Sequence, residues 1–115
     1  MRIATGKVVS GTVILDRTPW EEGAFLTVIA GDTGEDRKWI SFVRIATGEV
    51  AGGKVIVHEP PLQEGRFVAV LAQDDYRKLS AKDRMILTLS VEETVGREII
   101  STEELLNRLT LQRPG

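Results

Sequence analysis

Two copies of one sequence unit occupy most of the first 74 residues of the chain. Shifting the sequence by 42 positions aligns residues 2–32 with residues 44–74 without a gap, and 16 of the 31 aligned pairs are identical. The identities run from RIATG at the start of each unit to a shared P-x-x-E-G segment and a final aspartate. Two copies are too few for a solenoid, in which several repeats stack in a row. The expected architecture is therefore a fused pseudo-dimer, with the copies related by an approximate two-fold axis.

Within each copy, runs rich in Val, Ile, Thr and Phe alternate with turns that contain glycine, which favours strands over helices. In the first copy the expected strands cover residues 3–9, 12–17 and 24–30. The dipeptide Ser10-Gly11 and its counterpart Gly52-Gly53 fit two-residue hairpin turns, where positive φ is needed. We therefore expect each copy to form a three-stranded meander, so that the two copies supply about six strands.

The third expected strand of each copy, FLTVIA or FVAVLA, is apolar at almost every position. Such a strand is usually covered on both faces. A three-stranded unit cannot provide this cover alone, so the two copies should join as a pseudo-two-fold sandwich or small barrel. The predicted fold class is mainly β with a C-terminal α part. A duplicated β domain spans residues 1–75 and consists of repeat 2–32, junction 33–43 and repeat 44–74.

Residues 76–115 are the expected helical tail. Ser80 followed by Asp83 fits a helix N-cap and predicts a helix over about residues 81–94. The sequence STEE at residues 101–104 is a clearer capping box and predicts a second short helix. Helices of this length are marginal in water alone, so they either fold back on the barrel or finish folding on a partner.

Composition narrows the possible functions. The chain has 15 Lys and Arg against 17 Asp and Glu, a net charge of −2 that argues against binding nucleic acid or membrane through bulk positive charge. It has no cysteine, and His58 is its only histidine. No Ser-His-Asp grouping, phosphate loop or metal-ligand spacing is visible, so we expect no enzyme, metal or cofactor. The absence of a membrane-length apolar run or signal-peptide pattern predicts a cytoplasmic protein without a membrane partner.

Two stretches carry a family resemblance. GREIISTEELLNRL, at residues 96–109, resembles the C-terminal segment of antitoxins from type II toxin–antitoxin modules. In those proteins a helix ends at glycine and a second short helix follows an I-S pair. ATGKVVSGTVIL and PWEEGAFLTV, within residues 4–28, resemble the β-hairpin unit of a group of small antitoxins and, more distantly, the swapped-hairpin AbrB-like antitoxins. The family form has one hairpin unit and one tail, whereas the unit is doubled here.

The resemblance implies a protein that neutralises a cognate toxin, of RelE/ParE type, by occluding it with the helical tail. Apolar anchors would supply affinity, and acidic side chains would neutralise a cationic active site. The predicted toxin-binding residues are Ile86, Leu89, Ile99, Ile100, Glu103, Glu104, Leu105, Leu106 and Leu109.

Binding of operator DNA by the β domain would be an additional, autoregulatory role. Its predicted phosphate or base contacts are Arg2, Lys7, Arg44 and Lys54. Two alternatives stay open: a β-type DNA-binding transcriptional regulator, and a non-catalytic protein-interaction module. The chain is expected to be a monomeric pseudo-dimer or a homodimer.

Overall fold

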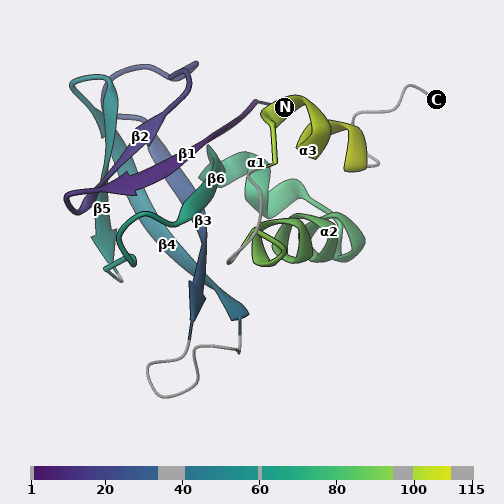
Figure 1. Cartoon of the computed structure of the whole chain (residues 1–115). Helices are drawn as coiled ribbons and strands as arrows, with labels where there is room; N and C mark the ends of the chain where they lie inside the picture. The colour runs from purple at the N-terminus through teal and green to yellow at the C-terminus, as the bar shows by residue number, and fades with distance from the viewer. Residues whose placement is uncertain (1, 34–40, 60, 95–99, 110–115) are drawn as a thin grey trace.

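The computed structural model describes residues 2–33, 41–59, 61–94 and 100–109, the side chains of residues 32–33 and 41–42 excepted. This described part forms a closed antiparallel barrel of six strands, with three short helices on one side of it (Figure 1). The strands are β1 (Ile3–Val9), β2 (Thr12–Leu15), β3 (Phe25–Thr33), β4 (Ser41–Ala51), β5 (Lys54–Glu59) and β6 (Phe67–Ala72). The helices are α1 (Gln73–Lys78), α2 (Ala81–Glu92) and α3 (Thr102–Arg108). The predicted fold class, mainly β with a C-terminal α part, is confirmed.

Both predicted hairpins are present. β1 pairs with β2, and β4 pairs with β5, each around a two-residue turn. Ser10 and Gly11 have φ angles of 52° and 79°, and Gly52 and Gly53 have 61° and 78°. Positive φ at both central positions is what a type I′ hairpin turn requires. The repeated dipeptides therefore located both turns correctly.

The third strand of each repeat does not complete a meander. The barrel order is β1-β2-β5-β4-β3-β6, so β3 pairs with β4 and β6, and β6 pairs with β3 and β1. The expected three-stranded meander is therefore wrong, because each third strand pairs with the first strand of the other repeat. β2 and β3 lie on opposite sides of the barrel, so residues 16–24 cross its end instead of turning back beside β2. The two repeats are interlocked.

An approximate two-fold axis relates the repeats. Val13 pairs with Val55, and Val28 pairs with Val70, and the members of both pairs are 42 positions apart (55 − 13 and 70 − 28). Each pair thus joins two equivalent residues. The axis must therefore cross the barrel wall between β2 and β5 and again, on the opposite side, between β3 and β6.

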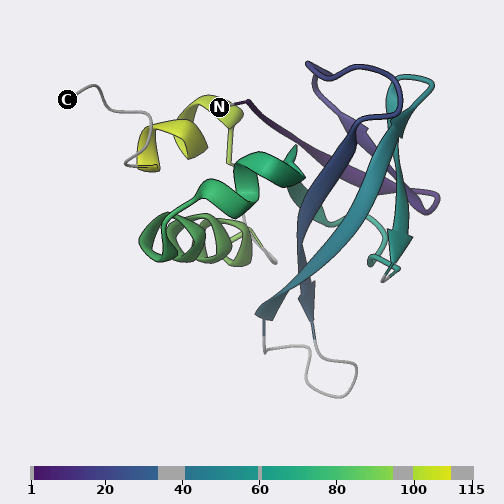
Figure 2. The same ribbon diagram turned by 180° about the vertical axis from the view of Figure 1, so that it is seen from behind.

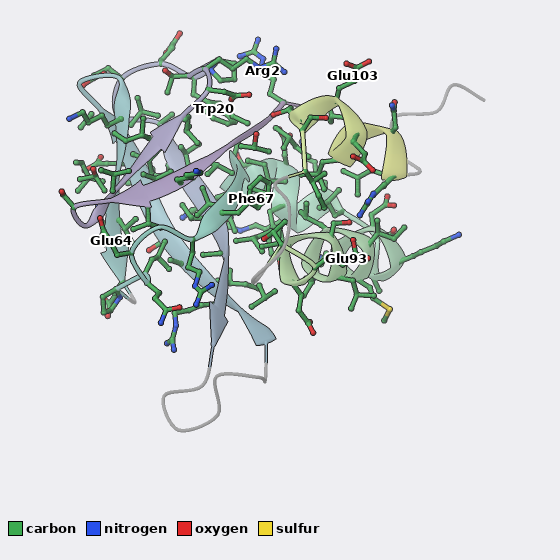
Figure 3. All side chains as sticks on the ribbon, viewed as in Figure 1. Arg2, Trp20, Glu64, Phe67, Glu93 and Glu103 are labelled. Atoms are coloured by element: carbon green, nitrogen blue, oxygen red, sulfur yellow. The ribbon has the colours of Figure 1, made fainter. Side chains whose placement is uncertain are left out.

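A glutamate from each repeat caps the hairpin turn of the other repeat. The Glu64 carboxylate accepts hydrogen bonds from the backbone N–H groups of Ser10 and Gly11, and Glu22 accepts one from the N–H group of Gly52. Figure 3 shows Glu64 beside the tip of the β1–β2 hairpin. Both glutamates belong to the P-x-x-E-G segment. The identity of this segment in the two copies therefore corresponds to a contact between the copies.

Apolar side chains form two clusters, one on each side of the barrel wall. The barrel interior holds Val8, Val13, Leu26, Val28, Ala30, Ala46, Val50, Val55, Val68 and Val70. The space between the wall and the helices holds Ile3, Ile29, Phe67, Ala69, Leu71, Leu79, Leu87, Val91, Ile100, Leu105 and Leu109. β3 and β6 contribute to both clusters, which explains their nearly continuous apolar sequences. The predicted cover on both faces is confirmed, but the helices supply the outer cover.

The three helices form one layer against β1, β6, β3 and β4 (Figure 2). Both predicted N-caps are present: Ser80 Oγ accepts from the Asp83 N–H at 3.1 Å, and Ser101 Oγ accepts from the Glu104 N–H at 3.1 Å. The sequence does not predict α1, because Ala72 at its N-cap position has no side chain that can cap a helix. The tail therefore begins directly at the end of β6.

A hydroxyl network fastens α3 to the barrel. Thr102 Oγ1 donates to Asp16 Oδ2 at 3.1 Å and lies 2.8 Å from Thr5 Oγ1. An ionised carboxylate only accepts hydrogen bonds, and a hydroxyl group donates one. The Thr5 hydroxyl is therefore the donor to Thr102. Thr5 and Thr102 are both buried, so this chain of donors places α3 against β1 in one orientation.

Arg108 joins α2 to α3. Its Nη1 donates to Glu93 Oε2 at 3.0 Å and to Ser90 Oγ at 3.1 Å, and its Nη2 donates to Glu104 Oε1 at 3.0 Å. The hydrogen bond to Glu93, together with the one to Glu104, raises the pKa of Arg108 above its ordinary value. The Arg108 side chain is 32% exposed, so solvent screening limits the gain in stability to about 1 kcal/mol.

Candidate binding surface

The side of the barrel that the helices leave uncovered carries apolar side chains at outward positions. One row of paired residues crosses five strands and consists of Phe25, Glu49, Ile56, Thr12 and Val9. Directly paired residues point to the same face of a sheet. Phe25 is 61% exposed, Val9 46% and Ile56 38%. The row therefore faces solvent.

The two-fold axis generates a second row beside the first. It consists of Phe67, Lys7, Ile14, Lys54 and Ala51. The β2–β5 register, continued by one residue past Val13–Val55, places Lys54 next to Ile14. Ile14 is 39% exposed. Ile14 and Ile56 thus flank the point where the two-fold axis leaves the barrel.

The two rows differ at their phenylalanines. Phe67 is 5% exposed, because it lies between the barrel and the helices (Figure 3). Its equivalent, Phe25, is 61% exposed. Ile3 and its equivalent Ile45 differ in the same way, at 1% and 45%. One tail therefore covers only one end of a two-fold arrangement. We call the uncovered apolar residues of β1, β2 and β5 the open wall: Val9, Ile14 and Ile56, with Lys7, Thr12, Glu49 and Lys54 beside them. Phe25 and Ile45 are exposed on β3 and β4, which lie opposite β2 and β1 in the barrel.

An open groove of about 330 Å³ borders this wall on β1 and β2. Its lining is mostly apolar and comes from Thr5, Gly6, Lys7, Val9, Ile14, Leu15 and Asp16. Lys7 and Asp16 give it one charge of each sign. Because Thr5 and Asp16 also bind Thr102, the groove adjoins the helical layer. It could hold one or two apolar side chains of a partner, with a polar group at each charge.

Three residues predicted to contact a toxin are part of the protein's own core. Leu105 and Leu109 are fully buried, and Ile100 is 7% exposed. Ile86 and Leu106 are partly buried against the same cluster. These five side chains point toward the barrel, so the helices fold back on it, which is one of the two arrangements that the tail sequence allowed. The physical reason is that the outer faces of β3 and β6 are themselves apolar and are buried by the tail.

The remaining predicted toxin contacts are spread over the helical layer. Leu89 is 51% exposed on α2. Glu103 and Glu104 are exposed on α3, where Glu104 pairs with Arg108, and Figure 3 shows Glu103 at the edge of α3 remote from α2. Ile99 lies outside the described residues. The structure does not bring this set together as one surface.

The four residues predicted to contact DNA are also divided. Arg2 donates to a backbone carbonyl of the β2–β3 connection at 2.9 Å (Figure 3). Arg44 lies on β4, which is opposite β1 in the strand order, and has an interaction of its own. Only Lys7 and Lys54 come together, on the two sides of Ile14. Two lysines on the open wall are too few to form a basic surface.

Sequence reasoning missed the open wall, although a signal for it exists. β2 and β5 read TVIL and KVIV, so each has consecutive apolar residues where a strand with one solvated face should alternate. Val13 and Val55 point inward and are fully buried, which leaves Ile14 and Ile56 pointing outward. Both isoleucines are identical in the two copies. An apolar residue kept at the outward position in both repeats marks a candidate contact surface.

The described residues contain no group of three His, Asp or Glu side chains that could hold a metal ion. His58 Nε2 lies 3.4 Å from Glu49 Oε1, at the edge of the open wall. No helix among the described segments combines the length and the apolar character needed to cross a bilayer. Comparison with protein-family models, curated proteins and solved structures gives no match for this chain.

Proposed function

We propose that this chain is a protein-binding module that neutralises a toxin, as the resemblance implies, and that it holds its partner on the open wall of the barrel. The observation that carries the proposal is the exposed pair Ile14 and Ile56 at the two-fold axis, continued on β1 by Val9. Solvated strand faces usually carry polar residues, and a group of exposed apolar side chains on a protein surface is typical of a contact site.

Binding by a released tail is less favourable in energy. Removing the helices would expose three fully buried leucines, Leu87, Leu105 and Leu109, together with the strand residues beneath them. At about 1.5–3 kcal/mol for each leucine, the cost is roughly 5–9 kcal/mol. This approaches the whole stability of a typical domain, about 5–15 kcal/mol. We therefore assign the helices to the structure of the module and the open wall to its partner.

The open wall also defines what a partner should present. Apolar side chains of the partner would pack on Ile14 and Ile56 and in the adjoining groove. Lys7 and Lys54 lie on the two sides of Ile14 and would favour acidic groups around that contact. The assignment of the toxin to the RelE/ParE type rests on the resemblance alone.

Operator DNA is the second candidate partner, and the observation that favours it is the pairing of Lys7 and Lys54 on one row. Glu49 lies in the neighbouring row, and Asp16 lines the groove. These carboxylates oppose a close approach of phosphate. A gel-shift titration with the DNA upstream of the gene, in the absence of toxin, tests this candidate.

The proposal is tested with the protein encoded beside this chain. We expect Ile14→Glu with Ile56→Glu to weaken binding in calorimetry by at least about 100-fold and to abolish neutralisation, because charges replace the central apolar contact. Glu103→Lys should leave both toxin binding and neutralisation unchanged. Circular dichroism would confirm that the variants fold, since all three side chains are exposed.

If Glu103→Lys abolishes neutralisation and the isoleucine variant retains it, the toxin contact lies on the helical tail and not on the open wall. If the chain does not bind the protein encoded beside it but does bind operator DNA in the gel-shift assay, it is a DNA-binding regulator and the toxin-binding proposal is wrong.

A further inference from the structure

Helix α2 is apolar on two opposite sides. Leu87 and Val91 are fully buried against the barrel, whereas Met85 is 63% exposed and Leu89 51% exposed. At 100° per residue, Met85 and Leu89 lie within about 40° of each other and roughly opposite Leu87. A helix that covers a core on one side normally carries polar residues on the other, so an apolar outer side indicates a second contact.

The outer residues follow a defined spacing. Lys82, Met85, Leu89 and Glu92 are separated by three, four and three positions, which is the spacing of the contact seam in coiled coils. Lys82 is exposed, and Glu92 is half-buried. Among the described residues, neither makes a side-chain hydrogen bond or ion pair. We call these four residues the outer seam.

We propose that the outer seam pairs with the outer seam of a second copy, with the two α2 helices antiparallel. A two-fold axis level with residue 87 places each residue i opposite residue 174 − i of the other copy. Met85 then meets Leu89, because 85 + 89 = 174, and Lys82 meets Glu92, because 82 + 92 = 174. The apolar residues lie at the centre, and two ion pairs lie at the ends. A parallel pair would place Lys82 against Lys82.

The position of α2 permits this contact. α2 lies against β3, β4 and β6, and the side away from the barrel carries no other described element in either view (Figures 1 and 2). Three helical turns from each copy form a contact smaller than the roughly 1,200 Å² of typical stable complexes. We therefore expect a reversible dimer with a dissociation constant of about 1 µM or weaker.

Pairing through α2 leaves the open wall of each copy free. β2 and β5 are on the side of the barrel opposite β3 and β6, to which α2 is attached. The dimer therefore presents two open walls that face away from each other. Such a dimer binds two partner molecules, or one two-fold partner with increased avidity.

Charge exchange tests the pairing. Analytical ultracentrifugation of the full chain at low salt should show concentration-dependent dimers. Lys82→Glu alone and Glu92→Lys alone each replace two attractive contacts with two repulsive ones, so we expect each to weaken dimerisation about tenfold or more. Mixing the two single variants, or combining both changes in one chain, restores opposite charges at both ends and should restore the dimer.

Matched controls carry the same changes of charge away from α2. Arg17→Glu and Glu21→Lys alter exposed residues of the β2–β3 connection, and dimerisation should persist in both. Circular dichroism would check that each variant folds. A chain that stays monomeric at millimolar concentration would overturn the proposal. So would single variants that dimerise normally, or a mixture of them that stays monomeric.

Discussion

Replacing Leu105 with alanine distinguishes a tail that belongs to the core from one that is a free arm. Leu105 is fully buried in the cluster between α3 and the barrel. Truncating a buried leucine removes its burial energy and leaves a cavity, at a cost of about 2–5 kcal/mol. α3 has only seven residues and can shift to fill part of the space, so we expect the lower half of this range, about 2–3.5 kcal/mol.

This loss is large compared with the stability of the chain. At about 0.05–0.15 kcal/mol per residue, 115 residues give a free energy of unfolding of about 6–17 kcal/mol. Urea unfolding followed by tryptophan fluorescence and far-ultraviolet circular dichroism measures the change, and both signals should move together if helices and barrel unfold as one unit.

Leu89→Ala, measured at low protein concentration, is the matched control. The chemical change is the same, but Leu89 is 51% exposed on the outer side of α2. We expect its effect to stay within about 0.5 kcal/mol. An unchanged urea midpoint in Leu105→Ala would refute the reasoning, as would a truncated chain ending at Leu79 that keeps full stability.

Five further substitutions, at four positions, test the contacts between elements. Glu64→Ala should cost about 1 kcal/mol in thermal unfolding, because two turn N–H groups lose their acceptor. Gly6→Ala should lower the free energy of unfolding by about 3 kcal/mol or prevent folding, since the new Cβ would lie 2.0 Å from the Ile14 carbonyl oxygen. Gly11→Ala is the comparison: its φ of 79° is unfavourable for alanine but its Cβ meets no clash, so we expect a loss of about 1 kcal/mol. Thr102→Val should lower the free energy of unfolding by about 1–2 kcal/mol, because the buried Thr5 hydroxyl loses its acceptor. Thr102→Ser keeps the hydroxyl group and should retain most of this stability.

Each of these results has a contrary outcome. A Glu64→Ala protein as stable as the parent would mean that water serves the hairpin turn equally well. Equal effects for the two glycine substitutions would show that the approach of β1 to β2 is not tight. If Thr102→Ser is no better than Thr102→Val, the methyl group and not the hydroxyl network holds α3.

The tandem repeat predicted the strands, hairpin turns and two-fold relationship because these features depend on local sequence and on equivalence between copies. The pairing of β3 with β4 could not be predicted in the same way. A meander and an exchanged third strand place the same apolar residues inside, and only the path of residues 16–24 distinguishes them. Glu22 and Glu64 were visible as identical residues, but their role as caps depends on that path.

The tail shows a similar division. The capping boxes at Ser80 and Ser101 fixed the starts of α2 and α3, because caps act over three residues. Which side of each helix faces the barrel depends on long-range packing. An amphipathic helix has the same sequence signature whether its apolar side covers its own domain or another protein. The sequence therefore does not predict whether Leu105 and Leu109 pack on their own barrel or on a partner. The structure shows that both are buried against the barrel.

The pairing of Ile3 with Leu71 has a consequence for synthesis. β1 leaves the ribosome long before β6, and through that interval one edge of β1 has no neighbour. The same edge matches β6 of any adjacent nascent copy, and unpaired edges are templates for such exchange. Closely spaced ribosomes on one messenger therefore favour strand-exchanged products, whereas widely spaced ribosomes let each chain pair its own β1 with its own β6.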